Sequence, residues 1–304
     1  MRIAALLLLA VAASEDFRAN YDPMVEAARW LTDGGEPPAH WVVHAKLDLD
    51  FVLAAKTKLG TAGTKKVVEA RYRNTSVVVK RTKEWLIKTK YGESAVFAEL
   101  LFLEYCRGGP GIPRLLGGYR EDGQAVLVVE HMGLPIGGSL GSYKGRPKGH
   151  RVTNLNWVAF AEAAPLDAAR AIFRCFRSFA EIGGFILNDF TEQQFTYFEG
   201  ALYLVDGPLF ATGPAREFAD GVLTNVKTGD VLHQLSLGFR FMSSAQNSYK
   251  KHVHDVATKP YLLPFVISSS EGDDRAKLEA LSAAMTRPDP DARPSFTKLL
   301  AALG

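Results

Sequence analysis

The sequence lacks several features that would each point to a particular class of protein. Its 304 residues carry a formal net charge of only +3, and no long basic run occurs. Nucleic-acid binding usually needs a concentrated basic face, so the charge gives that function no support. Cys106 and Cys175 are its two cysteines, too few for a zinc site. There is no internal repeat, and beyond the N-terminus no apolar run approaches the ~20 residues of a membrane-spanning helix.

What the sequence does have is the composition of a folded protein. Hydrophobic residues make up 47% of the chain and aromatic residues 11%. A chain of this length and composition can bury one large core or two lobes. The two cysteines have two interpretations: buried free thiols that behave as small hydrophobic residues, or one disulfide formed in an oxidising compartment.

The N-terminus has the layout of a secretory signal peptide. A positive start is followed by an uncharged run of small and aliphatic residues, and Ala10 and Ala12 form an A-x-A pattern before acidic residues. We therefore expect residues 1–13 to be a signal peptide, with no transmembrane segment after its removal. An uncleaved anchor or a buried terminal helix is the alternative. Asn74 begins an N-glycosylation sequon, which has meaning only in the lumen.

Hydrophobic patterning divides the rest of the chain into an extension and two lobes. Residues 14–47 form a helical extension, with a helix predicted over 17–33. Residues 48–132 predict a strand-rich lobe with one helix over 93–106, and residues 133–304 begin with a glycine-rich connector and are then mainly helical. The fold class is therefore α+β, with a β-rich N-terminal lobe and an α-rich C-terminal lobe. Strands are expected at 51–54, 67–68, 76–79, 114–119, 125–129 and 201–205, and a strongly amphipathic helix at 165–182.

The first candidate for a phosphate site is a glycine turn followed by a lysine. Gly60 and Gly63 lie between two strand-like runs, and glycine lets backbone N–H groups approach phosphate oxygens closely. Lys80 directly follows a run of three valines, where an ammonium group is costly unless it has a partner. Alone, such a turn is typical of a β-hairpin, and such a lysine of a strand end. The helix that follows offers Glu99 as the partner, with Glu104 as the alternative.

Two aspartates supply the acidic half of a candidate site. Asp189 follows an apolar run and begins a polar turn that contains Gln194. Asp206 directly follows a short predicted strand and precedes a glycine, a good position for a metal ligand. Asp189 is placed to orient a hydroxyl nucleophile and accept its proton. Capping of loops by both carboxylates is the simpler alternative.

The order of these motifs resembles that of a eukaryotic protein kinase. The valine run ending in Lys80 resembles the V-A-I-K strand, and Glu99 lies where a kinase helix places the glutamate that pairs with this lysine. Glu130 and Met132 belong to a segment that resembles the hinge that holds adenine. The resemblance covers about residues 48–303. It implies that Lys80 and Glu99 act in catalysis, that Lys80 also binds the nucleotide, and that Glu130 and Met132 bind it as well.

The larger lobe carries further matches. Asp189 and Gln194 keep the spacing of the catalytic loop H-R-D-x-x-x-x-N, and Asp206 stands at the first position of D-F-G. Asp289–Phe296 resembles the late D-P-x-x-R-P-S-F segment of kinase C-terminal lobes, which contains no catalytic residue and supports the fold independently. The resemblance implies that Asp189 is catalytic and that Asp206 and Gln194 hold Mg²⁺ or Mn²⁺. ATP would be the phosphate donor.

Departures from the usual motifs resemble a divergent subgroup, the secretory-pathway kinases. This group includes vertebrate lonesome kinase, protein O-mannose kinase and the cysteine-rich divergent protein kinase domain proteins. Gly60–Lys65 resembles its G-x-G-x-x-K turn, which implies that Gly60, Gly63 and Lys65 bind the nucleotide. His254–Pro264 is similar to a C-lobe segment of the group, whereas the cysteine-rich insert and an A-P-E motif are absent. The implied substrate is a hydroxyl of a lumenal or extracellular protein or glycan.

The motifs leave two interpretations of activity. Thr191 replaces a lysine that neutralises phosphate, Gln194 replaces the shorter metal-binding asparagine, and Pro208 stands third in the D-F-G element. These changes favour a secreted pseudokinase that binds nucleotide or a partner and acts as a scaffold or activator. The lysine, the helix glutamate and both aspartates nevertheless remain. We therefore predict an active atypical kinase and keep the pseudokinase as the alternative.

Overall fold

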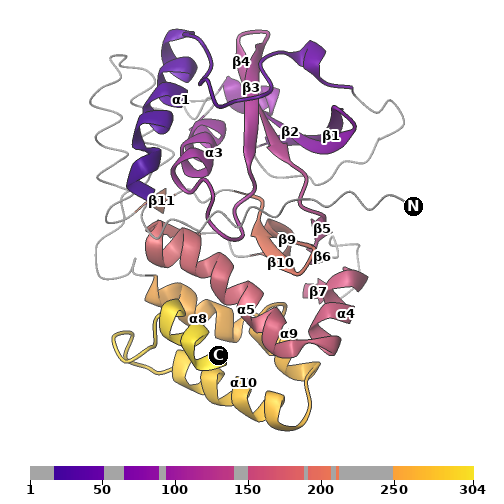
Figure 1. Cartoon of the computed structure of the whole chain (residues 1–304), viewed down its shortest axis with the longest axis vertical. Coiled ribbons are helices and arrows are strands. Elements are labelled where there is room, and N and C mark those ends of the chain that lie inside the picture. Colours follow the sequence, from indigo (N-terminus) through magenta and orange to yellow (C-terminus); the bar gives the residue numbers. More distant parts are fainter. Residues whose placement is uncertain are drawn as a thin grey trace.

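The computed structural model describes residues 17–50, 65–88, 94–139, 150–187, 191–206, 210–211 and 249–304. These residues form a mixed α+β protein with antiparallel strands and several helices. Figure 1 shows the main sheet with helices beside it in the upper part and most of the other helices below. No helix within the described part is long and apolar enough to cross a membrane. The predicted signal peptide lies outside the described residues.

The main sheet has four antiparallel strands in the order β1-β2-β4-β3. Arg73 and Asn74 form the tight turn between the first two strands, and both have the positive φ that such hairpin turns require. The sequence predicts all four strands, although β1 is longer than the two valines that indicate it. The strands are β1 (Lys65–Tyr72), β2 (Thr75–Thr82), β3 (Leu115–Glu121) and β4 (Gln124–Glu130).

Alternation along β2 sends Val77 and Val79 to one face of the sheet and Lys80 to the other. Val77 and Val79 are buried in a small apolar cluster with valines of β4. Successive residues of a strand point to opposite faces, and Lys80 therefore projects toward the face that α3 (Ser94–Tyr105) covers. The alternation thus delivers Lys80 to the helix that carries Glu99.

A second helix packs on α3. It is α1 (Tyr21–Asp33), preceded by the short 3-10 helix η1 (Phe17–Asn20), and Figure 1 shows it beside α3. Gly34 ends α1 in the left-handed conformation that is common at helix C-termini. The predicted helix over 17–33 is confirmed, as is its buried apolar face of Met24, Ala27, Ala28 and Leu31.

The largest core joins the strand-rich part to the helical part. It includes side chains of α1, α3 and α5 (Pro165–Phe176), together with the helices near the C-terminus. The sequence predicts one helix over 165–182, but the α-helix ends at Phe176 and continues as the π-helix η3 (Arg177–Ile182). Ser178, Phe179 and Ala180 in this π-helix are buried.

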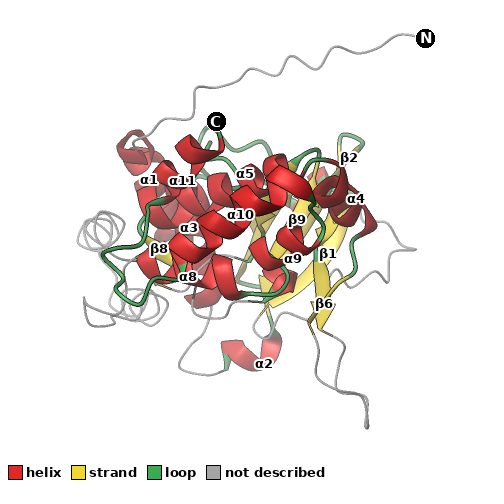
Figure 2. Ribbon diagram, turned by 90° about the horizontal axis from the view of Figure 1, so that it is seen from below, coloured by secondary structure: helices red, strands yellow, loops and turns green. Residues whose placement is uncertain are grey.

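Short strands and helices complete the lower part, which Figure 2 shows from below. Strands β10, β9 and β5 form one small antiparallel sheet, while β8 pairs with β11 and β6 with β7. The mainly helical C-terminal region that the sequence predicts is confirmed from residue 250 onward. The helical elements of the lower part are α4 (Leu155–Ala163), η4 (Glu192–Gln194), α8 (Lys250–Thr258), α9 (Leu263–Ser268), α10 (Gly272–Met285) and α11 (Phe296–Leu303), while the short η2 (Lys46–Asp48) and α2 (Glu84–Ile87) belong to the strand-rich part. The strands are β5 (Leu134–Pro135), β6 (Gly137–Ser139), β7 (His150–Val152), β8 (Phe185–Ile186), β9 (Phe195–Phe198), β10 (Ala201–Leu204) and β11 (Phe210–Ala211).

Both cysteines are buried free thiols. Burial raises the pKa of Cys106 and of Cys175, so both remain protonated at neutral pH. Cys175 donates its S–H weakly to the carbonyl of Gly111, at 3.8 Å. The interpretation as small hydrophobic residues is therefore confirmed, and the disulfide between the two parts of the molecule is not formed.

Candidate active site

A buried network of charges joins the sheet, α3 and the end of β10. The Glu99 carboxylate receives the Lys80 ammonium group at 2.6 Å and the Lys65 ammonium group at 2.5 Å. Lys65 also reaches the carboxylate of Asp206 at 2.5 Å, and Lys80 donates a second hydrogen bond to the carbonyl of Val205. Segments far apart in the sequence thus converge on one cluster of two cations and two anions.

The register of the β1–β2 hairpin explains why two lysines meet one glutamate. Lys80 lies opposite Val67, while Lys65 lies opposite Thr82. Lys65 and Val67 point to the same face of β1, because side chains alternate with a period of two. The two lysines are therefore diagonal neighbours on the face that α3 covers, within reach of the same helix residue.

The network fixes the charge of its members. Burial alone would raise the pKa of Glu99, but the two ammonium groups outweigh burial and lower it to about 2. Burial alone would lower the pKa of Lys65, but the carboxylates of Asp206 and Glu99 outweigh it and raise the pKa. Both residues are therefore ionised at neutral pH. The side chain of Asp206 is 37% exposed, so the network opens to solvent at this end.

Glu104, the alternative partner for Lys80, lies elsewhere. Its carboxylate is fully buried and accepts hydrogen bonds from Trp41 Nε1 at 2.6 Å and from His40 Nε2 at 2.9 Å. Of the two glutamates left open by the sequence, Glu99 is the one that the structure brings to Lys80. The ion pairs of Lys65 with Glu99 and Asp206 were not predicted. The alternation of side chains along β1 and β2 could have indicated them, because it places Lys65 on the same face as Lys80.

Gln194, predicted as a metal ligand, is buried beside the strand that leads to Asp206. Its backbone carbonyl accepts a hydrogen bond from Val205 N–H at 2.8 Å. Its amide oxygen accepts one from Thr191 N–H at 3.2 Å, so this oxygen is engaged within its own turn. Among the described residues, no group of three or more His, Cys, Asp or Glu side chains could hold a metal ion. Asp206, the other predicted metal ligand, is the partly exposed carboxylate of the network.

Glu130 and Met132 lie where the main sheet joins the small sheet below it. Glu130 ends β4 and donates its N–H to the carbonyl of Arg114 at 2.9 Å, while Met132 is buried. Gly133 has a φ of 73°, and a Cβ there would lie 2.2 Å from the carbonyl oxygen of Tyr197 on β9. The segment is thus held closely against β9. The segment joins the main sheet to the small sheet.

A residue that the sequence analysis did not select binds the backbone of Leu187, the last described residue before Asp189 in the chain. His252 on α8 is fully buried, and its Nε2 accepts a hydrogen bond from Leu187 N–H at 3.0 Å. The proton therefore sits on Nδ1, which lies 3.5 Å from the carboxylate of Asp255. Burial lowers the pKa of His252, which keeps the ring neutral and able to accept. Asp189 itself, together with Gly60, Gly63 and Pro208, lies outside the described residues.

The arrangement suits a bound polyanion with a divalent cation. Lysine ammonium groups are common phosphate ligands because each is a compact charge with several donors. A carboxylate such as that of Asp206 is a ligand that Mg²⁺ prefers. No model of a known protein family matches the sequence, and no curated protein matches it. The chemistry of the network and the order of its residues therefore carry the functional interpretation.

Proposed function

We propose that the chain is a divergent secretory-pathway kinase with a two-lobed kinase fold. It would transfer the γ-phosphate of ATP to a hydroxyl group of a lumenal or extracellular protein or glycan. Residues 48–132 would be the smaller lobe and residues 133–304 the larger one. The observation that carries the proposal is the Lys80–Glu99 ion pair, which lies next to Asp206 at the end of β10.

The described residues fit a nucleotide and its metal ion in part. Lys80 and Lys65 would hold phosphate oxygens, and Glu99 keeps both ammonium groups in place. Asp206 would hold the Mg²⁺ ion, which together with ATP supplies a transferable phosphoryl group and neutralises its charge. Asp189 would orient the substrate hydroxyl and accept its proton. The hinge segment around Glu130 would hold the adenine.

The competing proposal is a pseudokinase that binds nucleotide without turnover. Two observations favour it: the amide oxygen of Gln194 is engaged by Thr191, and the carboxylate of Asp206 is paired with Lys65. A metal ion held by both groups would compete with these partners. Such a protein would act through a partner as a scaffold or activator. The two proposals share the nucleotide site and differ in the chemical step.

Phosphate transfer from labelled ATP is the test that separates the two proposals. Purified wild-type protein is compared with Lys80→Met and Asp189→Asn in an incorporation assay on secreted proteins and glycans. Lys298→Met is the matched control, because this lysine is exposed on α11. Kinase activity predicts incorporation by the wild type and control alone. Equal incorporation by wild type and Asp189→Asn would remove Asp189 from catalysis.

A thermal-shift measurement tests nucleotide binding separately. ATP with Mg²⁺ should raise the melting temperature of the wild type and of Asp189→Asn, but not that of Lys80→Met. Stabilisation without incorporation supports the pseudokinase. Absence of stabilisation in the wild type contradicts both proposals.

The secretory route has its own test at Asn74. This residue lies exposed in the turn between β1 and β2. Expression with the native N-terminus in animal cells should give protein in the medium that glycosidase digestion shortens on a gel. Asn74→Gln should lose the shift, and Asn156→Gln, an exposed asparagine outside any sequon, should keep it. Retention of the whole unglycosylated chain in the cytoplasm would contradict the route.

A further inference from the structure

The N-terminal segment packs against both α3 and the sheet, and we call residues 17–44 the N-terminal clamp. Its helix α1 contributes Met24, Ala27 and Leu31 to the same core as the apolar side chains of α3. Figure 1 shows α1 lying along α3. The clamp is therefore an integral part of the fold around the candidate site, although it lies outside the segment that resembles a kinase.

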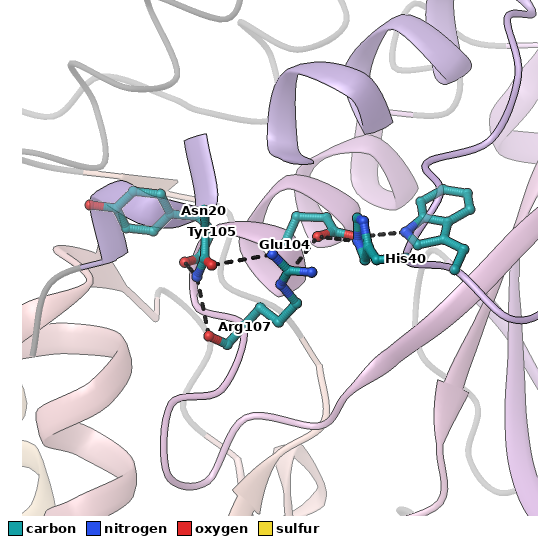
Figure 3. A network of polar contacts seen from close by, with 6 residues as sticks. Asn20, His40, Glu104, Tyr105 and Arg107 are labelled. Atoms are coloured by element: carbon teal, nitrogen blue, oxygen red, sulfur yellow. Dashed lines mark hydrogen bonds and ion pairs between the residues drawn. The ribbon is translucent and has the colours of Figure 1, made fainter. Parts of the chain in front are cut away.

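Polar contacts fasten the clamp to the C-terminal half of α3 (Figure 3). The indole N–H of Trp41 donates to Glu104 Oε1 at 2.6 Å, and His40 Nε2 lies 2.9 and 3.0 Å from the two oxygens of the same carboxylate. A carboxylate oxygen only accepts, so His40 Nε2 carries a proton here. Because Glu104 is fully buried, these donors replace the water that its carboxylate would otherwise bind.

The clamp also closes the end of α3. The Asn20 side-chain amide donates to the carbonyl oxygens of Tyr105 at 2.8 Å and of Arg107 at 3.1 Å. Helices leave their last carbonyl groups without partners inside the helix, so Asn20 supplies a partner from another segment. The ring of Phe17 packs edge-on against Tyr105, with centroids 5.6 Å apart.

The other side of the clamp is bound to the main sheet. Val42 N–H and Val43 N–H both donate to the carbonyl of Leu116 on β3, and Gly118 N–H donates to the carbonyl of Val43. A Cβ at Gly117 would lie 2.1 Å from that Val43 carbonyl oxygen, so only glycine permits the approach. The clamp is thus hydrogen-bonded both to the helix that carries Glu99 and to the sheet that carries Lys80.

We propose that the N-terminal clamp sets the position of α3 relative to the sheet and thereby holds Glu99 against the two lysines. His40 and Trp41 are positioning residues that act through Glu104. The helix is rigid, and Glu104 lies about 7.5 Å along the axis from Glu99, so a shift at one is transmitted to the other. The consequence for nucleotide binding rests on the proposed function, whereas the effect on α3 does not.

Trp41→Phe is the primary test, because it removes the indole donor and keeps an aromatic ring. Hydrogen exchange of the α3 amides, residues 96–103, should become about tenfold faster, as expected for one lost hydrogen bond to a charged group. The Kd for ATP with Mg²⁺ should rise by about the same factor. Thr297→Val is the matched control: it loses a hydroxyl that contacts Arg177 and Glu181 and takes no part in the contacts of the clamp. This control should lower the melting temperature without changing exchange in α3.

A pair of variants at His40 separates positioning from general damage. His40→Gln keeps an N–H donor and should retain exchange protection and nucleotide affinity near those of the wild type. His40→Leu removes the donor and should behave as Trp41→Phe does. Unchanged α3 protection in both Trp41→Phe and His40→Leu, at equal fold by circular dichroism, would overturn the proposal. If the wild type binds no nucleotide, the proposed function fails, and the exchange comparison still decides whether the clamp positions α3.

Discussion

Glu99 and Glu104 are two buried carboxylates on the same helix, and each accepts hydrogen bonds from a different kind of donor. Glu99 receives two lysine ammonium groups, one of which continues to the partly exposed Asp206. Glu104 receives the indole of Trp41 and the imidazole of His40, two ring N–H donors from the N-terminal clamp, and His40 is partly exposed. Both carboxylates are withdrawn from water, so burial alone does not distinguish a chemical site from a structural one.

The difference lies in what the partners can do. A lysine ammonium group stands on a flexible stem and can exchange a carboxylate for a phosphate oxygen. The indole of Trp41 has one donor that is fixed by the packing of its ring, which lies 5.0 Å from the ring of Trp30. The region around Glu99 is therefore suited to ligand binding, and the region around Glu104 to holding the helix in place. Changing each carboxylate separately tests this distinction.

The largest expected effect follows substitution of Glu99. Glu99→Gln should lower phosphate transfer roughly 100- to 1,000-fold, because about 3–4 kcal/mol of electrostatic stabilisation would be lost. Glu104→Gln, the matched change on the same helix, should lower it by no more than about tenfold. Initial rates of phosphate transfer at saturating ATP measure the loss in each variant. Equal losses in the two variants would erase the distinction between the regions.

Acid should weaken the region around Glu99. The pKa of Glu99 is about 2 in the folded protein and 4.5 for an ordinary glutamate, so its ionised form is favoured by folding. This stabilisation is fully present above about pH 4.5 and is lost as the pH falls toward 2, about 3 kcal/mol in all. Urea unfolding at a series of pH values measures it. The free energy of unfolding of Glu99→Gln should fall less steeply than that of the wild type as the pH is lowered below about 4.5. Glu279 is an exposed glutamate on α10, and Glu279→Gln should keep the wild-type pH dependence.

Glu104→Gln should act on stability more than on chemistry. The amide keeps one oxygen for Trp41 but turns an N–H donor toward His40 Nε2 at this buried position of α3, so we expect a loss of about 2 kcal/mol in the free energy of unfolding. Urea unfolding checks this, with Glu279→Gln as an exposed control expected to stay within about 0.5 kcal/mol. If Glu104→Gln leaves the free energy of unfolding unchanged, the carboxylate is not needed at this contact.

The smallest effect is expected at the edge of the second region. Arg107 Nε lies 3.9 Å from the carboxylate of Glu104, and its side chain is 30% exposed. Arg107→Ala should therefore cost less than about 1 kcal/mol of stability, since exposed and distant ion pairs contribute little. A loss as large as that of Glu104→Gln would extend the buried network to Arg107.

Much of the local structure could be predicted from the sequence. The helix over 17–33 and the strands of the main sheet follow from hydrophobic periodicity, which depends on near neighbours in the chain. The Lys80–Glu99 pair could be proposed because a lysine after an apolar strand requires a partner. His252 could not be selected, because its role depends on Leu187, a distant residue that only the fold brings to it.

The sequence by itself determined the α+β composition, the order of the charged residues and the need of each buried charge for a partner. Only the tertiary structure decided which partner each one has. Positions 99 and 104 of an α-helix project about 140° apart, so the side of α3 that faces the sheet selects Glu99 for the lysines and leaves Glu104 for the N-terminal clamp. The physical reason is that charge and periodicity are properties of the chain, whereas the pairing of buried charges depends on how the helix is oriented against the sheet.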